Sequence, residues 1–387
     1  AIYFIIVFDV YWFIRISYLL VYLLISWTKF HRLKGIDWFE KLKEYTKLDW
    51  RDYQHLIFLP TAGESFEVVD ATFQRLIETK YDSKKMTIIL AGEERKGQQF
   101  LDVASQIEGK YASYFNKIII TVHPMDVPGE MAGKGSNMHF AGHLAKKYVD
   151  EQGWDYARVI VSCFDVDTLV DPQYFGYLTY EYLTTENPTH YSYQPLAFYH
   201  NNIWESNFIT RVVANGTTFW LLTDMARSER LFTFSSHSMS FETLVNVGFW
   251  QNDIVTEDSR IFLQCFIYYN GDYHVKPMYV AVSMNTVYMG KLWRSLLNQY
   301  KQMRRWAWGV EHFPYMSWNF AKRKSIPFIK KLRYLWNQTE GVYSWATAPI
   351  LIFILGRLPL YFAEKTNQTS VIAQQAPYIL EFMMTIG

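Results

Sequence analysis

Two carboxylates stand directly after a short apolar run, at a spacing that suits metal chemistry. The run VIVSC (159–163) is followed by FDVDT, which places Asp165 and Asp167 at alternate positions. Carboxylates so placed after a strand can converge on one hard divalent cation and leave positions open for diphosphate oxygens. Such a metal would act as a Lewis acid that helps a nucleoside diphosphate to leave. The plain alternative is a solvated loop, and the apolar residues on both sides favour the metal-binding interpretation.

A second acidic group lies at the start of a predicted helix, in DIVTEDSRIFLQC (253–265). Thr256, Glu257 and Asp258 all suit a helix N-terminus, where they interact with free amide groups and the helix dipole. In the alternative interpretation, Asp258 is a general base that takes the proton from an acceptor hydroxyl as that hydroxyl attacks a sugar carbon. Taken alone, the segment favours the helix cap.

The third group is a Gln-x-x-Arg-Trp arrangement within YKQMRRWAWG (300–309), formed by Gln302, Arg305 and Trp306. An indole offers a flat face to a sugar ring, and a guanidinium group can bind two diphosphate oxygens in a fork. Trp and Arg are also favoured at membrane surfaces, so an amphipathic interfacial helix would explain the same residues. Both interpretations stay open on this segment alone.

Four apolar runs rich in Val, Ile and Leu must position these groups. They alternate with segments of helical spacing and lie at 55–61, 86–92, 116–124 and 157–168. This alternation predicts an α/β fold, with a mainly parallel sheet and helices on both faces. In such sheets ligands bind beyond the carboxyl ends of the strands, which is where the Asp-x-Asp group stands.

Apolar segments flank the predicted sheet and favour a membrane protein. Residues 1–28 are long enough to span a bilayer, for which about 20 apolar residues are needed. A second span is predicted at 341–362 and a third, cut short, at 371–387. Basic residues on the inner side of the first two spans place the domain between them in the cytoplasm. Asp9 and Arg15 within the first stretch indicate a functional pathway or a lipid head-group contact. The favoured alternative is an ion pair with another helix, or a first helix that only partly spans the membrane.

Composition agrees with a polar body that has apolar ends. Half of the 387 residues are hydrophobic and 18% are aromatic, but the mean hydropathy of -0.10 argues against a chain made only of membrane helices. A net charge of +1 gives no global preference for nucleic acid. Cys163 and Cys265, the only cysteines, are expected as buried free thiols in a reducing compartment. His123 and His237 could be metal ligands, although a packing or polar role is favoured for both.

The order of these groups resembles one known family. Pro60-Thr61, Asp165-x-Asp167, Thr256-Glu257-Asp258 and Gln302-x-x-Arg305-Trp306 are similar in order and spacing to motifs of the membrane-integrated family 2 glycosyltransferases. These include the cellulose, chitin and hyaluronan synthases and the ceramide glucosyltransferases. The resemblance covers roughly residues 54–310. It implies a GT-A-like fold flanked by transmembrane helices, and an inverting transfer from a nucleotide-sugar donor.

The resemblance also implies a role for each matching position. Asp165 and Asp167 would hold the diphosphate and its Mg²⁺ or Mn²⁺, and Asp258, beside Glu257, would be the catalytic base. Nucleotide-sugar contacts would come from Thr61, Glu64, Glu93 and Lys134. The acceptor and diphosphate would meet at Gln302, Arg305 and Trp306. The chain departs from the family at PTAGE (60–64) and at AGEER (91–95), where Glu93 or Glu94 replaces the usual base-contacting Asp.

The expected organisation is a membrane segment at 1–30, a cytoplasmic catalytic domain at 31–310, an interfacial segment at 311–340 and membrane segments at 341–387. The expected location is the plasma membrane or an equivalent membrane. The expected activity is transfer of a sugar, favoured as UDP-linked, to a growing polysaccharide. A single addition that makes a glycolipid and a non-catalytic assembly component remain alternatives, and a glycoside hydrolase is disfavoured. Expected partners are the donor, a polysaccharide or lipid acceptor, membrane lipids and further membrane subunits.

Overall fold

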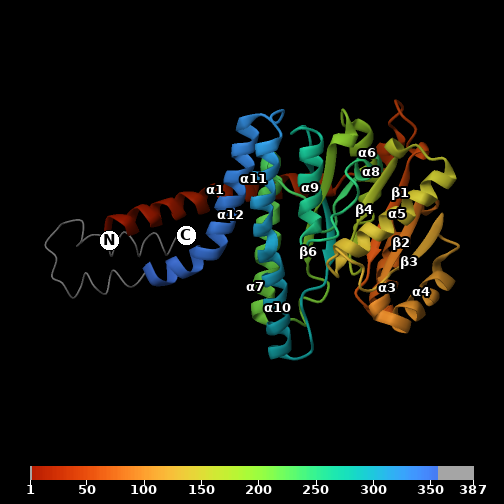
Figure 1. Ribbon diagram of the computed structural model, residues 1–387, viewed down its shortest axis with the longest axis horizontal. Coiled ribbons are helices and arrows are strands. Elements are labelled where there is room, and N and C mark those ends of the chain that lie inside the picture. Colours follow the sequence, from red (N-terminus) through yellow and green to blue (C-terminus); the bar gives the residue numbers. More distant parts are fainter. Residues whose placement is uncertain (1, 356–387) are drawn as a thin grey trace.

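The computed structural model describes residues 2–355, which fold around one sheet (Figure 1). The strands within these residues form an eight-stranded sheet in the order β3-β2-β1-β4-β7-β6-β8-β5. Their bounds are β1 Gln54–Pro60, β2 Met86–Glu93, β3 Lys117–His123, β4 Val159–Cys163, β5 Leu169–Val170, β6 Tyr191–Tyr199, β7 Ser238–Ser240 and β8 His274–Met284.

The strands β3, β2, β1 and β4 form a parallel half-sheet, as the alternating pattern predicts. Every residue of β2 and β4 is buried, which explains why these strands are continuous apolar runs. Phe58 in β1 lies opposite Cys163 in β4, so the two strands end at the same edge of the sheet. The loops after these two strands therefore lie side by side.

The other half of the sheet is mixed, so the expectation of a mainly parallel sheet holds only for the first four strands. The short strand β7 pairs antiparallel with both β4 and β6, and β5 pairs antiparallel with β8. The pairing of β6 with β8 is parallel. β7 has only three residues, Ser-Met-Ser, with no apolar alternation that would indicate a strand or its direction.

The α-helices pack on this sheet or extend from it. Their bounds are α1 Ile2–Lys34, α2 Trp38–Lys43, α3 Phe66–Ile77, α4 Gly97–Tyr111, α5 Lys134–Gln152, α6 Tyr174–Thr184, α7 Phe208–Met225, α8 Phe241–Asn246, α9 Glu257–Tyr268, α10 Leu292–Ala307, α11 His312–Lys322 and α12 Phe328–Leu355. Short 3-10 turns connect several of them, at 50–52, 83–85, 94–96, 156–158, 188–190, 228–230 and 308–311. α5 contacts β1, β2 and β3, while α6 contacts β8.

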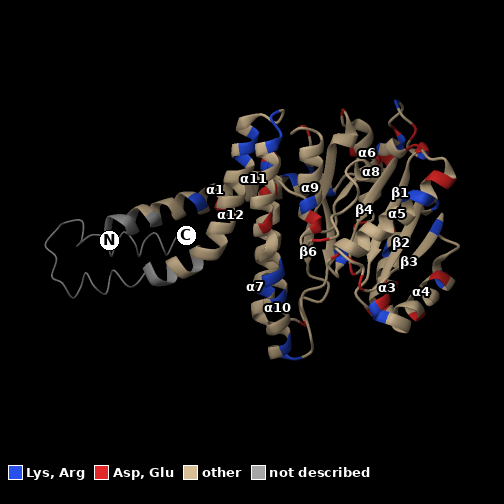
Figure 2. Cartoon of the chain, viewed as in Figure 1, with Lys and Arg blue, Asp and Glu red and all other residues tan. Residues whose placement is uncertain are grey.

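The outer parts of α1 and α12 extend away from the α/β body, with α7, α10 and α11 beside the sheet, while the inner end of α1 contacts β8 (Figure 1). Within residues 2–355, Val10–Lys34 is the one segment that is long and apolar enough to cross a membrane. Figure 2 shows the outer parts of α1 and α12 with few charged residues. The predicted spans at 341–362 and 371–387 fall partly or wholly on residues 356–387, outside the described residues.

The ion pair favoured for Arg15 is confirmed. Its guanidinium group contacts the Glu340 carboxylate, so an ion pair joins α1 to α12. Glu340 also accepts a hydrogen bond from Arg230 at 3.2 Å. The interpretation of Asp9 falls on a side chain outside those that the structure describes. Cys163 and Cys265 are buried free thiols, as expected.

Candidate active site

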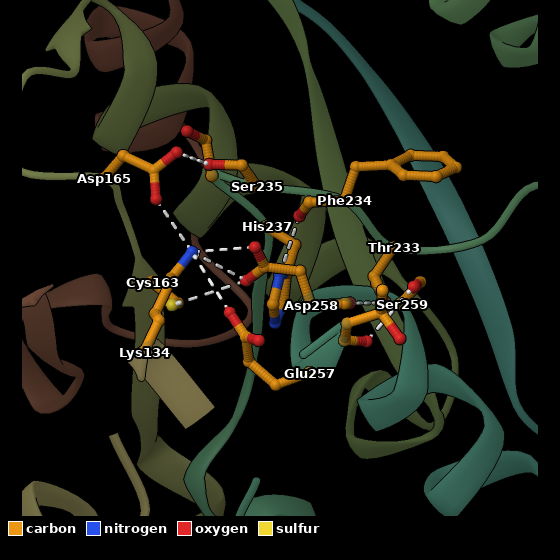
Figure 3. Close-up of polar contacts among 12 residues, drawn as sticks. Lys134, Cys163, Asp165, Thr233, Phe234, Ser235, His237, Glu257, Asp258 and Ser259 are labelled. Atoms are coloured by element: carbon orange, nitrogen blue, oxygen red, sulfur yellow. Dashed lines mark hydrogen bonds and ion pairs between the residues drawn. The ribbon is translucent and has the colours of Figure 1, made fainter. Parts of the chain in front are cut away.

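A lysine and three carboxylates meet at the carboxyl edge of the parallel half-sheet (Figure 3). The Lys134 ammonium lies 2.8 Å from Asp165 Oδ1 and 2.7 Å from Asp258 Oδ2. It lies 3.8 Å from Glu257 Oε1. We call these four residues the lysine–carboxylate cluster. Lys134 opens α5, Asp165 follows β4, and Glu257 and Asp258 open α9, so three separate elements build the cluster.

The segment GKGSN brings Lys134 to this position because Gly135 allows a close approach. A Cβ atom on Gly135 would stand 2.7 Å from the backbone oxygen of Gln251. Real side chains do not make so short a contact, so glycine lets the start of α5 lie against the segment before α9. This packing places Lys134 so that its ammonium group reaches both Asp165 and Asp258.

The charges of the cluster stabilise one another. Burial opposes the charge on Lys134, but Asp165 and Asp258 outweigh it and hold the pKa of Lys134 well above its usual range. Burial also opposes the charge on Asp165. The Lys134 ammonium and a 2.7 Å hydrogen bond from the Ser235 hydroxyl overcome this, and they lower the pKa of Asp165. Both groups are therefore charged at neutral pH.

The neighbouring Glu257 has the opposite character. Burial, and after it the charge of Asp258, raises the pKa of Glu257 to about 8. Glu257 therefore holds a proton at neutral pH and makes a poor base there. Lys134 pairs closely with Asp258, which has a side-chain exposure of 21% against 6% for Glu257. Of the two predicted catalytic acids, Asp258 is thus the accessible carboxylate.

The helix-cap interpretation of this segment is only partly correct. Thr256 occupies the N-cap of α9, but its hydroxyl makes no capping bond. It donates instead to Glu311 Oε1 at 2.6 Å. The acidic side chains of the first turn do stand at the positive end of the helix dipole. A cap alone therefore does not account for the three polar residues.

Asp167 is held by the segment that follows β8. Its Oδ2 atom accepts a hydrogen bond from the backbone amide of Asn285 at 3.0 Å, at the end of β8. Burial, followed by the charge of Asp165, raises the pKa of Asp167 to about 6. Two crowded carboxylates of this kind fit a divalent cation, because a cation relieves their mutual repulsion.

The donor set suits a metal that brings other ligands with it. Among residues 2–355, no group of three or more His, Cys, Asp or Glu side chains has the geometry to hold a metal ion by itself. Asp165 and Asp167 can supply two carboxylates. Mg²⁺ typically takes only one or two carboxylates, together with water and phosphate oxygens. The residues present therefore fit Mg²⁺ or Mn²⁺ bound together with a diphosphate.

The two histidines proposed as alternative ligands have other partners. His123 Nε2 lies 2.7 Å from Glu130 Oε2, in the loop after β3. His237 is buried, and its Nδ1 atom lies 2.9 Å from the carbonyl oxygen of Phe234. Both contacts are of the polar, structural kind that the sequence favoured.

The predicted nucleotide contacts lie along the ends of β1 and β2. The Thr61 amide donates to Ala91 O at 2.8 Å, which continues the pairing of the two strands. Glu64 accepts from the Ala62 amide at 2.7 Å, and its charge contributes to the raised pKa of Asp167. Glu93 is buried and forms an ion pair with Arg95. The structure thus brings Thr61, Glu64 and Glu93 to the sheet edge that holds the cluster.

The Gln-x-x-Arg-Trp group lies on α10, beside the same edge. Gln302 and Trp306 line a small recess together with Tyr199 and Asn285. Burial, and then the charges of Asp165 and Asp167, raises the pKa of Tyr199, so this recess adjoins the carboxylates. Arg305 is exposed, and its charge contributes to the lowered pKa of Asp165. The three residues therefore lie near the Asp-x-Asp group.

The family follows from comparison with known proteins. Residues 160–379, more than half of the chain, match the family model described as glycosyl transferase family group 2. The chain belongs to glycosyltransferase family 2. This confirms the predicted glycosyltransferase class, while the membrane-integrated subgroup and its named synthases remain predictions. A search of curated protein sequences found no match.

A solved structure shows the fold of this family 2 glycosyltransferase in another protein. The mannosyltransferase PcManGT from Pyrobaculum calidifontis, in complex with GDP-Man and Mn²⁺, aligns with 95% of each chain, 12% identity and a TM-score of 0.53. S. aureus TarS (residues 1–349) in complex with UDP-GlcNAc aligns with 60% of this chain and 59% of its own, at 9% identity and a TM-score of 0.40. At these identities, the likeness to PcManGT shows a shared mixed α/β fold.

One part of the site in this family 2 glycosyltransferase was missed by sequence reasoning. A network between α9 and α11, which we call the α9–α11 clamp, consists of Thr256, Ser259, Arg260, Glu311 and His312. Arg260 Nε donates to His312 Nδ1 at 3.2 Å, and its guanidinium group lies 3.9 Å from the centre of the Tyr315 ring. His312 Nε2 lies 2.7 Å from the Ser259 hydroxyl. The polar residues in TEDSR and VEH were the available signal, but nothing in the sequence pairs them.

Proposed function

We propose that this protein transfers a sugar from a nucleoside-diphosphate sugar to an acceptor hydroxyl in one inverting displacement. The observation that carries the proposal is the position of Lys134, whose ammonium group joins Asp165 to Asp258. A group that binds diphosphate and a group that accepts a proton must lie on either side of the anomeric carbon. The two sides of the lysine–carboxylate cluster offer this arrangement.

The donor side is formed by Asp165, Asp167, Lys134 and Arg305. A bound Mg²⁺ or Mn²⁺, held by Asp165 and Asp167, would neutralise charge on the leaving diphosphate. Lys134 supplies a permanent positive charge, because its pKa lies well above its usual range. Thr61, Glu64 and Glu93 would contact the nucleotide at the ends of β1 and β2. The complex of PcManGT with GDP-Man and Mn²⁺ supports a nucleotide-sugar donor and a divalent metal here.

The acceptor side is formed by Asp258 and the α10 group. Asp258 would take the proton of the acceptor hydroxyl. At the same time, the hydroxyl oxygen would bond to the anomeric carbon and the bond from that carbon to the diphosphate would break. Glu257 holds a proton at neutral pH and would not compete as a base. Gln302 and Trp306 would line the acceptor's path. Because the acceptor oxygen attacks from the face opposite the leaving diphosphate, a single displacement inverts the anomeric centre.

The acceptor is proposed to be a growing polysaccharide, and a lipid that receives a single sugar is the second candidate. The candidate span Val10–Lys34 supports a membrane location. Residues 31–310 would then lie in the cytoplasm. Residues 1–30 and 341–387 would lie in the plasma membrane or an equivalent membrane, and residues 311–340 along its surface. A polysaccharide synthase would make a ladder of products or a high polymer, and a single addition would make one glycolipid band.

The test is nucleotide release by detergent-purified protein from a panel of UDP- and GDP-sugars, with Mn²⁺ or after chelation. We expect release to require the metal and to fall by about 10²–10⁴-fold in Asp258→Asn. Asp272→Asn, which changes an exposed carboxylate bonded to His190 and His274, is the matched control and should keep wild-type turnover. Equal turnover in wild type and Asp258→Asn would refute the assignment of the base.

The metal assignment has its own measurement. Asp167→Asn removes one of two proposed ligands, so the Mn²⁺ concentration that gives half-maximal release should rise by about tenfold or more. Lys134 and Asp258 are unchanged in this variant, so activity should return at saturating metal. A half-saturating concentration equal to that of wild type would show that Asp167 does not bind the metal.

A further inference from the structure

Two histidines on α5 lie close together outside the lysine–carboxylate cluster. His139 and His143 are four residues apart, so they stand on the same face of the helix. Their Nε2 atoms are 3.2 Å apart, and their ring centroids are 4.7 Å apart. His143 is exposed and His139 is half-buried, so an ion could reach the point between them from solvent.

The hydrogen bond on the far side of His139 fixes its tautomer. His139 Nδ1 lies 2.9 Å from the carbonyl oxygen of Trp250. A carbonyl oxygen can only accept, so Nδ1 carries the proton and Nε2 presents a lone pair toward His143. Histidines that bind metals are typically oriented in this way, by a bond from the second ring nitrogen to a carbonyl or carboxylate. Burial, then the charges of His139 and Lys146, lowers the pKa of His143.

The separation of the two nitrogens matches the span of two metal–nitrogen bonds. Bonds of about 2.0–2.1 Å at a tetrahedral angle place the nitrogens roughly 3.3–3.4 Å apart, and at a right angle roughly 2.8–3.0 Å apart. The observed 3.2 Å lies between these values. Lys146, the nearest cation on the next turn, is 2.7 Å from Asp150, which offsets its repulsion of an incoming ion.

We propose that His139 and His143 form a binding site for a borderline divalent ion, Cu²⁺, Ni²⁺ or Zn²⁺, with water completing its coordination. Imidazole nitrogens suit these ions, whereas carboxylates suit Mg²⁺ and Mn²⁺. The ion would replace the proton that otherwise joins the two Nε2 atoms in a hydrogen bond. The site is therefore chemically distinct from the pair Asp165 and Asp167, and it does not rest on the proposed function.

A bound ion would act on the helix that carries Lys134. His139 lies five residues after Lys134, which is about 7.5 Å along α5. Through Trp250, the ion would also fix the segment before α9, whose Gln251 accepts a hydrogen bond from Arg260 at 2.8 Å. It would thus tie together the starts of the two helices that meet in the lysine–carboxylate cluster.

The experiment is a metal titration of the full chain in detergent, without a polyhistidine tag, after chelator treatment and in millimolar Mg²⁺. Competition with a chromophoric chelator measures Cu²⁺, Ni²⁺, Zn²⁺ and Mn²⁺ binding. We expect one equivalent to bind, with Cu²⁺ and Ni²⁺ far tighter than Mn²⁺. Loss of an outer-shell partner alone typically costs 10–100-fold in affinity, so His143→Ala should lose at least about tenfold.

Two further variants keep the test sharp. His274→Ala removes a histidine from a different surface group and should bind metal as wild type does. His139→Asn should lose affinity as His143→Ala does, and the Cu²⁺ complex of wild type should show two coupled nitrogens by electron paramagnetic resonance. Equal affinity in wild type and His143→Ala, or no binding in the presence of Mg²⁺, would overturn the proposal. Turnover with Mg²⁺ alone should not change in His143→Ala.

Discussion

Lys134→Met removes the ammonium group on which Asp165 and Asp258 converge, and it should destabilise the fold. The two closest contacts are 2.7 and 2.8 Å, and the lysine side chain is 18% exposed. Removing one partner from a largely buried ion pair typically costs about 3–5 kcal/mol, because the remaining charges lose their counter-ion. With an unfolding entropy of about 2.1 cal/mol/K per residue, or roughly 0.7 kcal/mol/K for some 350 residues, this corresponds to about 4–7 °C in Tm.

The pH dependence follows from the direction of each pKa shift. Because the pKa of Lys134 is raised, its ion pairs stabilise the folded protein fully below the pKa that the lysine has in the unfolded chain. This stabilisation is lost only as pH rises through the higher pKa of the folded protein. Because the pKa of Asp165 is lowered, its charged contacts stabilise the folded protein above the pKa of about 3.9 that it has in the unfolded chain. This stabilisation is lost as pH falls through the lower pKa of the folded protein. The loss in Lys134→Met should therefore be largest near neutral pH. It should shrink only below about pH 4, as pH falls from the unfolded toward the folded pKa of Asp165.

Thermal unfolding in detergent at about pH 3.5 and pH 7.5 measures both effects. Lys80→Met is a matched control, because Lys80 pairs with Asp37 on the surface at 2.6 Å, where solvent screens the interaction. The double variant Lys134→Met/Asp258→Asn should recover part of the lost Tm, because it removes one uncompensated carboxylate. A Lys134→Met protein as stable as wild type at pH 7.5 would refute this account of the lysine–carboxylate cluster.

Two further predictions concern the neighbours of Asp258. Glu257→Gln should raise Tm at pH 7.5, because the folded protein holds a proton at a pKa of about 8 that the unfolded chain releases near pH 4.3. The gain should vanish near pH 4, where Glu257 is protonated in both the folded and the unfolded state. Thermal unfolding curves of the two proteins from pH 4 to pH 7.5 measure it, and an equal Tm at pH 7.5 would contradict the prediction. His312→Ala should lower kcat by roughly tenfold to a hundredfold, through misplacement of α9, while the Mn²⁺ requirement is unchanged. An equal loss in the surface control His190→Ala would contradict a specific role for the α9–α11 clamp.

The parts of the site that follow buried parallel strands could be predicted from the sequence. The strand that ends in VIVSC places Asp165 at the sheet edge, because parallel strands end at the same side. Lys134 came from the family resemblance, and its contact with Asp258 did not follow from the sequence. These two residues are 124 positions apart, and only the packing of α5 against the segment before α9 brings them together.

Other features had no local pattern that could reveal them. Strand β7 is three residues long and looks like a loop, so the antiparallel pairings around it were missed. The bond from Asn285 to Asp167 depends on where β8 ends. The α9–α11 clamp joins residues more than fifty positions apart, and each is an ordinary surface residue type by itself. Pairings of this kind are set by tertiary packing, which periodicity and motif order do not encode.

The single lysine among several carboxylates has a consequence for the order in which ligands arrive. At neutral pH, Asp165, Asp167 and Asp258 together outnumber the one positive charge of Lys134, with Arg305 at the rim. A bare nucleotide diphosphate, itself an anion, would meet a repulsive field on entering. The divalent ion should therefore enter first or arrive already complexed with the donor. Initial-rate measurements should then show the metal–nucleotide complex as the true substrate, and free nucleotide sugar in excess over metal as a weak competitor.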